Sequence, residues 1–299
     1  MKVRVGFGLG TLTRAGEPTA FTGLVDALES HGFDSLWLSE RVSADAPEPV
    51  VGLAMAAGRT DRLKLGTSVQ VLPGRNPALL AAQWATLDRL SGGRALPAFG
   101  LGVADPREQA LFGVERGQRA AWFDEALPLM RRFWTGEPIT HEGERFHYHG
   151  VRVGPTPVQQ PLDVWLGGAA PSELRRVGRL GDGWLPSFCT PDDVAEGQQA
   201  VMESAAEHER EIDPEHWGAL VLYTAAGPLP DLLAEVVRRR RPGTAPEAII
   251  PAGLPALRSR LKELIDAGAS KFVVVRVPEP ESWPTELAEL ANAVLDLQT

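Results

Sequence analysis

The chain is poor in cysteine and in long apolar runs, and both shortages limit the cellular locations that we expect for the protein. Cys189 is the only cysteine among 299 residues, so no disulfide forms within the chain. Because no secretion signal is visible either, we expect a cytoplasmic protein. No apolar run approaches the ~20 residues that cross a bilayer, so a membrane protein is not expected.

The sequence also lacks an excess of basic charge. It has 30 Lys and Arg against 39 Asp and Glu, which gives a net charge of -9. Nucleic-acid-binding domains carry a basic footprint, so nucleic acid is not an expected partner. Two catalytic signatures are missing as well. There is no G-x-S-x-G nucleophile motif, and residues 99–102, FGLG, lack the third glycine and the acidic residue of a dinucleotide-binding fingerprint.

What the sequence does contain is a strand–helix–strand pattern in its first third. Apolar runs at 63–72 and 95–101 flank residues 77–90, whose apolar positions recur at helical spacing. Asn76 suits a helix cap, and Pro77 suits the first helical position. The pattern predicts a parallel βαβ unit, in which ligands bind at the carboxyl ends of the strands.

The same alternation continues along the whole chain. It predicts strands at 3–9, 33–38, 63–72, 95–101, 162–166, 183–186, 217–224 and 271–277. It predicts helices at 18–30, 49–58, 77–90, 106–133 (broken near Gly113 and Gly117), 172–180, 192–211, 229–240, 254–267 and 286–297. The fold class is therefore α/β, a single (β/α)8 TIM-like barrel over 1–299 with an insertion around 134–161. A doubly wound open sheet is the alternative.

Two motifs at predicted strand ends each allow a functional and a plain interpretation. Glu40 follows the strand at 33–38 and either accepts hydrogen bonds from a ligand or pairs at the rim with Arg41. Residues 66–69, GTSV, mark either a bulge with close backbone approach or a plain buried strand.

A glycine-rich turn is a third candidate. Residues 166–172, LGGAAPS, run from a predicted strand into a helix. Exposed backbone N–H groups and the helix dipole favour an anion site there, to which the hydroxyl of Ser187 adds. A simple glycine turn is the alternative.

Two clusters of charge have plain interpretations. His141, His147 and His149 lie in an alternating segment that predicts a solvated hairpin, and a metal site would need a further ligand and a second shell. Residues 238–241, four arginines, end a predicted helix, where cations complement the dipole and face solvent.

Taken together, the motifs resemble the bacterial-luciferase-like monooxygenase superfamily. The segments that carry the resemblance are, in chain order, GFDSLWLSER, RLKLGTSVQVLPGRNPALLAAQWATLDRLSGGR, FGLG, FDEALPLMRRFWTGEPITHEGERFHY, PTPVQQP, VWLGG and RLGDGW. They lie within residues 3–187, and AGASKFVVV resembles the family's last strand. The resemblance implies a TIM-like barrel with an insertion, a flavin or deazaflavin at its carboxyl face, and a homodimer.

Within the superfamily the chain is most similar to the coenzyme F420-dependent branch, which implies roles for particular residues. That branch carries a non-prolyl cis peptide at the position of Ser68 and Val69, beneath the deazaflavin ring. The resemblance implies a ring contact from Glu40 and a cofactor lining from Leu101 and Gly102. The residues implied to hold the phosphate are Gly167, Gly168, Ala169, Ala170 and Ser187.

Two departures bear on the substrate. Members that oxidise glucose-6-phosphate carry histidine where this chain has Arg41, and glutamate where it has Val103. The resemblance therefore implies no sugar-phosphate oxidation, and we assign no catalytic acid or base. Arg41, Arg75 and Arg107 follow predicted strand ends, and we expect them to bind the acidic tail of F420 or the substrate.

The leading hypothesis is an F420-dependent oxidoreductase that transfers a hydride between the cofactor and an unidentified small organic substrate. An FMN-dependent monooxygenase of the same superfamily is the alternative. A second alternative is a flavin-binding barrel without activity, because a fold does not fix a function.

Overall fold

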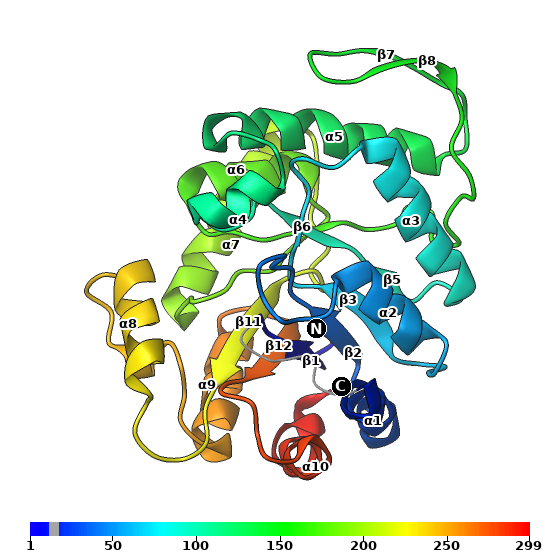
Figure 1. The fold of residues 1–299 in the computed structure, drawn as a ribbon. Helices are drawn as coiled ribbons and strands as arrows, with labels where there is room; N and C mark the ends of the chain where they lie inside the picture. Colours follow the sequence, from blue (N-terminus) through cyan, green and yellow to red (C-terminus); the bar gives the residue numbers. More distant parts are fainter. Residues whose placement is uncertain (12–17) are drawn as a thin grey trace.

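The computed structural model describes residues 1–11 and 18–299, and in them parallel strands form a closed barrel (Figure 1). The strand positions are β1 (Arg4–Leu9), β2 (Ser35–Leu38), β3 with β4 (Lys64–Thr67, Gln70–Val71), β5 with β6 (Ala95–Leu96, Ala98–Gly100), β9 (Trp165–Leu166), β10 (Gly183–Trp184), β11 (Gly218–Tyr223) and β12 (Lys271–Arg276). The predicted TIM-like barrel is confirmed.

The order of the strands around the barrel follows the order of the chain. β1 pairs in parallel with β2 and with β12, so the last strand returns to the first. Between β10 and β11 the ring is completed by two isolated bridges, Trp184 to Trp217 and Ser187 to Leu220. An open doubly wound sheet would leave two free edges, so that alternative is wrong.

Two of the predicted strands are interrupted. The run at 63–72 divides into β3 and β4 around Ser68 and Val69, whose peptide bond is cis, as the family resemblance implies. The run at 95–101 divides into β5 and β6 around Pro97. Proline has no N–H group to donate to a neighbouring strand, which accounts for the second interruption.

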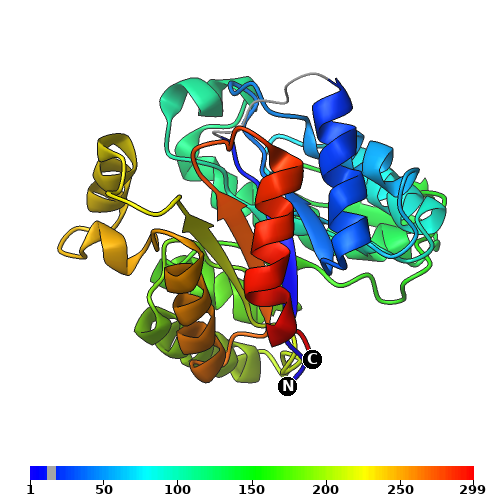
Figure 2. The ribbon, with the colours of Figure 1, turned by 90° about the horizontal axis from the view of Figure 1, so that it is seen from below.

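Helices surround the barrel and also cover part of one end. The outer helices are α1 (Pro18–His31), α2 (Pro49–Ala57), α3 (Pro77–Leu90), α5 (Arg119–Trp134), α6 (Pro171–Leu180), α7 (Pro191–Glu207), α9 (Leu254–Asp266) and α10 (Trp283–Val294). Two further helices, α4 (Pro106–Leu111) and α8 (Asp231–Arg240), lie at the end toward which the strands point (Figure 2). This carboxyl end is where barrels of this kind bind ligands.

Helix boundaries follow local backbone signals. The helix predicted at 106–133 separates into α4, the short η1 (Arg116–Gln118) and α5, with Gly113 at a φ of 65° between the first two. α7 stops short of the predicted residue 211, because Glu209 has a left-handed φ of 56°. The remaining short helices are η2 (Pro246–Ala248) and η3 (Leu295–Leu297).

The predicted insertion is a hairpin outside the barrel. β7 (Ile139–Glu142) and β8 (His147–Val151) pair antiparallel and project beyond α5 (Figure 1). The chain returns past α3, where the buried carboxylate of Asp88 accepts hydrogen bonds from the N–H groups of Val158 and Gln159. One buried carboxylate therefore fixes the return path of the insertion.

Large rings fill the barrel interior because glycines face them. Trp37 and Trp165 are almost completely buried. A Cβ on Gly66 would lie 2.4 Å from the ring of Trp37, and a Cβ on Gly183 would lie 2.6 Å from that of Trp165. Gly66 is thus required by close packing. Within the described residues, no helix is long and apolar enough to cross a membrane.

Candidate functional site

The interruption between β3 and β4 forms a half-exposed platform at the carboxyl end of the barrel. Ser68 and Val69 are both partly exposed. The hydroxyl of Ser39 lies 3.1 Å from both the carbonyl and the hydroxyl oxygen of Ser68 and fixes the turn. A Cβ on Gly100 or Gly167 would lie 2.6 Å or 3.0 Å from a methyl group of Val69. Both glycines therefore make room for an apolar surface between neighbouring strands.

Glu40 is turned away from solvent and belongs to an ion pair. Its side chain is 2% exposed, accepts a hydrogen bond from the N–H of Val71 at 2.7 Å and pairs with Arg75. Burial raises the pKa of Glu40, although the charge of Arg75 and the N–H of Val71 act to lower it. The rim pair with Arg41 is wrong, since Arg41 lies 3.3 Å from Asp105. The guanidinium of Arg75 is held in the ion pair with Glu40. The ring contact of Glu40 stays a prediction.

The turn after β6 is held by an arginine that the sequence did not single out. Arg119 is 8% exposed, and its guanidinium donates to the carbonyls of Leu101 at 2.6 Å, Gly102 at 3.3 Å and Val103 at 3.2 Å. Gly102 has a φ of 81°, a conformation that other residues rarely adopt. Burial lowers the pKa of Arg119, and the charge of Arg116 lowers it further. Arg119 thus shapes the segment implied to line the cofactor.

The glycine-rich turn between β9 and α6 presents converging N–H groups. The N–H groups of Ala169 and Ala170 both donate to one carboxylate oxygen of Glu173, each at 3.0 Å. Gly168 has a φ of 100°, and a Cβ there would lie 2.5 Å from the carboxyl carbon of Glu173. The indole N–H of Trp184 donates to the Gly168 carbonyl at 2.7 Å and anchors the turn.

This arrangement tests whether the turn fits a phosphate. The carboxylate of Glu173 serves as an internal stand-in, since it shows that the two amides hold an anionic oxygen together. The N–H of Leu185 donates to the carbonyl of Leu166, so the segments after β9 and β10 start side by side and bring Ser187 toward the turn. The turn therefore fits a phosphate, but its own glutamate has to give way first.

The segment after β2 is tied to α4. Glu108 is buried, and its carboxylate accepts hydrogen bonds from the N–H groups of Val42 at 2.6 Å and Ser43 at 3.1 Å. With the pair between Arg41 and Asp105, this contact holds two carboxyl-end loops together. Arg107 on α4 has an exposed side chain.

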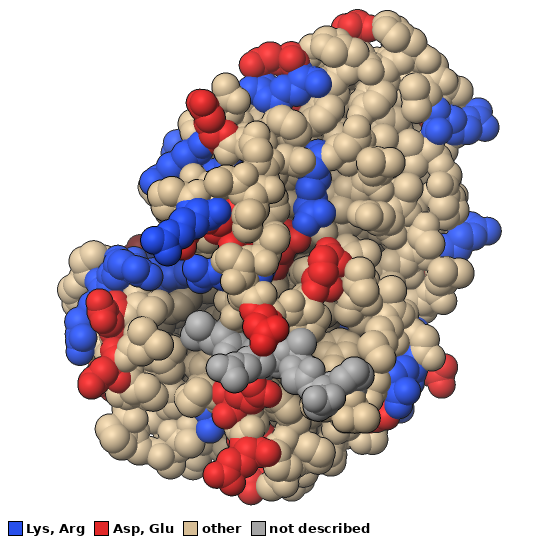
Figure 3. Space-filling view, in the orientation of Figure 1, with Lys and Arg blue, Asp and Glu red and all other residues tan. Residues whose placement is uncertain are grey.

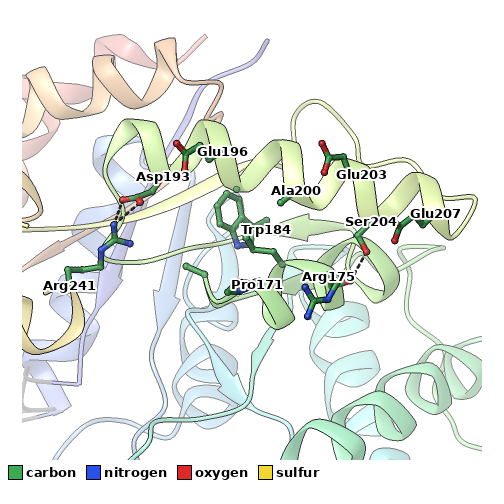
Figure 4. A pocket seen from close by; sticks show the side chains of 13 residues that line it. Pro171, Arg175, Trp184, Asp193, Glu196, Ala200, Glu203, Ser204, Glu207 and Arg241 are labelled. Carbon is green, nitrogen blue, oxygen red and sulfur yellow. Dashed lines mark hydrogen bonds and ion pairs between the residues drawn. The ribbon is translucent and has the colours of Figure 1, made fainter. Parts of the chain in front are cut away.

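One of the arginines at 238–241 differs from the solvated face that was expected. The guanidinium of Arg240 stacks over the ring of Phe188 at 4.6 Å. Arg241 forms an ion pair with Asp193 on α7 at 2.6 Å (Figure 4). This pair borders a groove of about 430 Å³ between α6 and α7, with Trp184 and Glu196 among its lining residues. The interpretation as a solvated face is wrong for Arg241, which is half-buried, whereas Arg238, Arg239 and Arg240 are exposed as expected.

The histidine-rich hairpin engages carboxylates. His141 lies 3.1 Å from Glu125, and Glu142 contacts both His147 at 3.0 Å and His149 at 3.2 Å. In residues 1–11 and 18–299, no three side chains of His, Cys, Asp or Glu gather into a set that could hold a metal ion.

The fold and the site together define an α/β barrel with an apolar platform and an anion-holding turn at its carboxyl end. The sequence profile of the luciferase-like monooxygenase family matches residues 4–231 of the chain. The chain belongs to the luciferase-like monooxygenase family.

Individual relatives agree with this assignment. An F420-dependent glucose-6-phosphate dehydrogenase of Kineococcus radiotolerans is 35% identical over 52% of this chain and 49% of its own length. The 4-hydroxyprotoasukamycin monooxygenase of Streptomyces nodosus subsp. asukaensis is 33% identical over 81% of this chain and 70% of its own length. The coenzyme F420-dependent tetrahydromethanopterin reductase of Methanopyrus kandleri superposes with a TM-score of 0.80 at 20% identity, covering 100% of both chains. The chain thus spans about half the length of the first of these relatives.

Proposed function

We propose that this chain is an F420-dependent oxidoreductase that transfers a hydride between the deazaflavin and a small organic substrate. The observation that carries the proposal is the joining of the Val69 platform to the anion-holding turn. Gly167 makes room for Val69 and also begins that turn. A flavin-like cofactor combines an apolar ring system with a phosphate, so it needs both features at one end of the barrel. The dependence on F420 in the names of the Kineococcus and Methanopyrus proteins supports this choice of cofactor.

In this proposal the bound deazaflavin supplies the hydride chemistry. The chain supplies binding and orientation. Val69, Leu101 and Gly102 pack against the ring system, with Ser68 and Glu40 fixing the turn beneath it. The phosphate is held by Gly167, Gly168, Ala169, Ala170 and Ser187. Because the curated relatives name different substrates, the substrate is left at the level of a small organic molecule.

An FMN-dependent monooxygenase is the second candidate. Its support is the Streptomyces nodosus relative, which is named as a monooxygenase and matches 81% of this chain. FMN has the same combination of ring and phosphate, so the platform and the turn accept it on the same grounds. What separates the two cofactors is the acidic tail of F420.

The deciding experiment measures the affinities of the purified protein for F420 and for FMN side by side, by fluorescence titration. We expect F420 to bind more tightly. If FMN binds as tightly or more tightly, the monooxygenase is favoured, and if neither binds, the chain is a barrel that has lost its cofactor. The homodimer expected from the resemblance stays a prediction, which sedimentation velocity checks.

A further inference from the structure

The two sides of β11 are buried to different extents. Ala219, Val221 and Tyr223 face the surrounding helices and are buried. Leu220 and Leu222 point the other way and pack against the apolar cluster inside the barrel, yet both are only half-buried. In a barrel whose interior is filled, the inward side chains are the fully buried ones. The reversed order indicates that space inside the barrel reaches Leu220 and Leu222.

The neighbouring strands keep this space apolar. Val273 and Val275 of β12 belong to the interior cluster. β1 has glycines at its inward positions, and a Cβ on Gly8 would lie 2.7 Å from a methyl group of Val275 and 2.8 Å from one of Val273. Gly10, the next inward position, is half-exposed. β1 therefore places no side chain between the two valines and the carboxyl end of the barrel.

The polar side chains at the same strand ends face outward. The hydroxyl of Tyr223, on β11, donates to the carboxylate of Glu286 on α10 at 2.7 Å. The guanidinium of Arg276, on β12, lies 3.3 Å from the same carboxylate. Tyr223 and Arg276 are both buried in this contact. The ends of β11 and β12 thus turn their polar groups toward α10 and their aliphatic groups toward the interior.

Phe188 extends the apolar lining beyond β10. It follows Ser187, which bridges to Leu220, and its half-buried side chain packs against the interior cluster. The guanidinium of Arg240 stacks over its ring at 4.6 Å. Its backbone φ of 59° is rare for a bulky residue and persists only where the surroundings impose it, often at ligand sites. We call Leu220, Leu222 and Phe188 the apolar wall.

The apolar wall faces the platform across the barrel. Val69 lies between β3 and β4, at the third strand position, and β11 is the seventh of eight, so the two are on opposite sides of the ring. A flat ring system on the platform would turn its free face toward the wall. Charged side chains beside the platform are already paired within the chain, Glu40 with Arg75 and Arg41 with Asp105.

We propose that the substrate has an uncharged, apolar body that packs against the apolar wall. The inference rests on the proposed function and names the class of substrate, a neutral molecule rich in hydrocarbon. Half-buried Leu and Phe side chains expose apolar surface, and covering that surface favours binding of such a body. A charged group placed against aliphatic side chains would lose its hydration without gaining a partner.

The test titrates the full chain with 2-alkanones from 2-butanone to 2-octanone, by calorimetry, with and without F420. Octanoate is the charged probe of equal length. Leu222→Asn places an amide in the wall, and Leu222→Ala shortens the side chain without adding polarity. Leu79→Asn is the matched control, because Leu79 is a 68% exposed leucine on α3. Figure 3 shows mostly uncharged side chains over α3, so this variant measures non-specific binding to an apolar surface.

We expect each added methylene to raise the affinity of the wild type about 3- to 4-fold, as burial of a CH₂ group does. Leu222→Asn should weaken 2-octanone binding about 5- to 10-fold and Leu222→Ala about 3-fold. Leu79→Asn should have no effect. Octanoate should bind more weakly than 2-octanone, and bound F420 should leave the alkanone affinities unchanged or higher.

A flat alkanone series overturns the inference, and so does an equal loss in Leu79→Asn or no loss in either Leu222 variant. Tighter binding of octanoate than of 2-octanone would show that the site selects an anion. Mutual exclusion of F420 and alkanones would assign the wall to the cofactor instead of the substrate. The proposed function fails separately, if the wild type does not bind F420, and the series without cofactor still reports on the wall in that case.

Discussion

Glu173 and an incoming phosphate depend on the same two amides. Glu173→Gln keeps an oxygen that accepts hydrogen bonds but removes the competing negative charge. We expect F420 and FMN to bind about 2- to 5-fold more tightly to this variant, since a charge at a helix N-terminus is worth ~0.3–1 kcal/mol. Fluorescence titration measures the change, and Glu203→Gln on α7 is the control. Unchanged or weaker binding in a folded Glu173→Gln variant would place the phosphate elsewhere.

Gly168 sits where a side chain has neither the backbone conformation nor the space. Its φ is 100°, and an added Cβ would meet Glu173 at 2.5 Å. Losing one hydrogen bond from a backbone N–H to a charged phosphate costs ~1.5–3 kcal/mol, so Gly168→Ala should weaken FMN binding ~10- to 150-fold. Riboflavin, which lacks the phosphate, should bind as before. Gly227→Ala is a matched control, with a φ of 125° and nothing within 4 Å. An equal loss for riboflavin would contradict the assignment.

The part of the site that the sequence could not predict consists of contacts between residues that lie far apart in the chain. Strand ends identified Glu40, Ser68 and Val69 as neighbours on one face, because parallel strands share a carboxyl end. The partner of Glu40 is Arg75 instead of Arg41, and nothing in their spacing distinguishes the two. The stacking of Arg240 on Phe188 joins residues on different elements. Such pairs depend on how helices pack over the barrel.

At the level of elements, the alternation of strands and helices was predictable, because each repeats its apolar residues at a characteristic spacing. Helix starts were well marked, as with Asn76 ahead of α3, whose side chain accepts from two N–H groups of the first turn. The insertion was predictable as a hairpin, but its attachment through the buried carboxylate of Asp88 was not. In a sequence, an aspartate that will be buried cannot be distinguished from one that will lie at the surface.

Arg119 connects α5 to the turn after β6, and the turn depends on it. We expect Arg119→Met to lower the free energy of unfolding by ~1.5–3 kcal/mol, because the backbone carbonyls of the turn lose their charged hydrogen-bond donor. F420 affinity should fall as well, since Leu101 and Gly102 lose their support. Urea unfolding and cofactor titration are the two measurements. Arg116→Met, at an exposed arginine three residues earlier, is the control. Similar losses in both variants would mean that the effect is one of net charge.

At the scale of the whole molecule, the end opposite the site is held by one carboxylate. Asp34 precedes β2 and lies 2.9 Å from the ammonium of Lys271, 3.5 Å from Lys64 and 3.6 Å from Arg4. These residues start the neighbouring strands β12, β3 and β1. Burial opposes the ionisation of Asp34, but the charges of Lys271 and Lys64 outweigh it, and its pKa is lowered.

The lowered pKa of Asp34 makes the stability of the fold depend on pH. A carboxyl group that is more acidic when folded stabilises the fold above its unfolded pKa of ~3.9, and loses this contribution as the pH falls through its folded value. Asp34→Asn should cost roughly 3–5 kcal/mol at neutral pH, since it leaves the buried ammonium of Lys271 unpaired. Its loss of stability below pH ~4 should be shallower than in the wild type. Urea unfolding from pH 7 to pH 2.5, with exposed Asp45→Asn as control, tests this. Parallel pH curves would contradict the role of Asp34.

We expect the barrel to open first along the line between β10 and β11, because only two isolated bridges join these strands. The amide of Trp184 donates to the carbonyl of His216 at 3.1 Å, and that of Leu220 to Pro186 at 2.8 Å. β11 and β12, by contrast, stay paired over six residues. Local openings follow the weakest hydrogen-bonded boundary, so deuterium should reach the amides of Trp184 and Leu220 before those of β12. Because Ser187 lies on this line, a ligand that bridges it to the glycine-rich turn would act as a clasp, slowing exchange at the seam more than anywhere else in the ring.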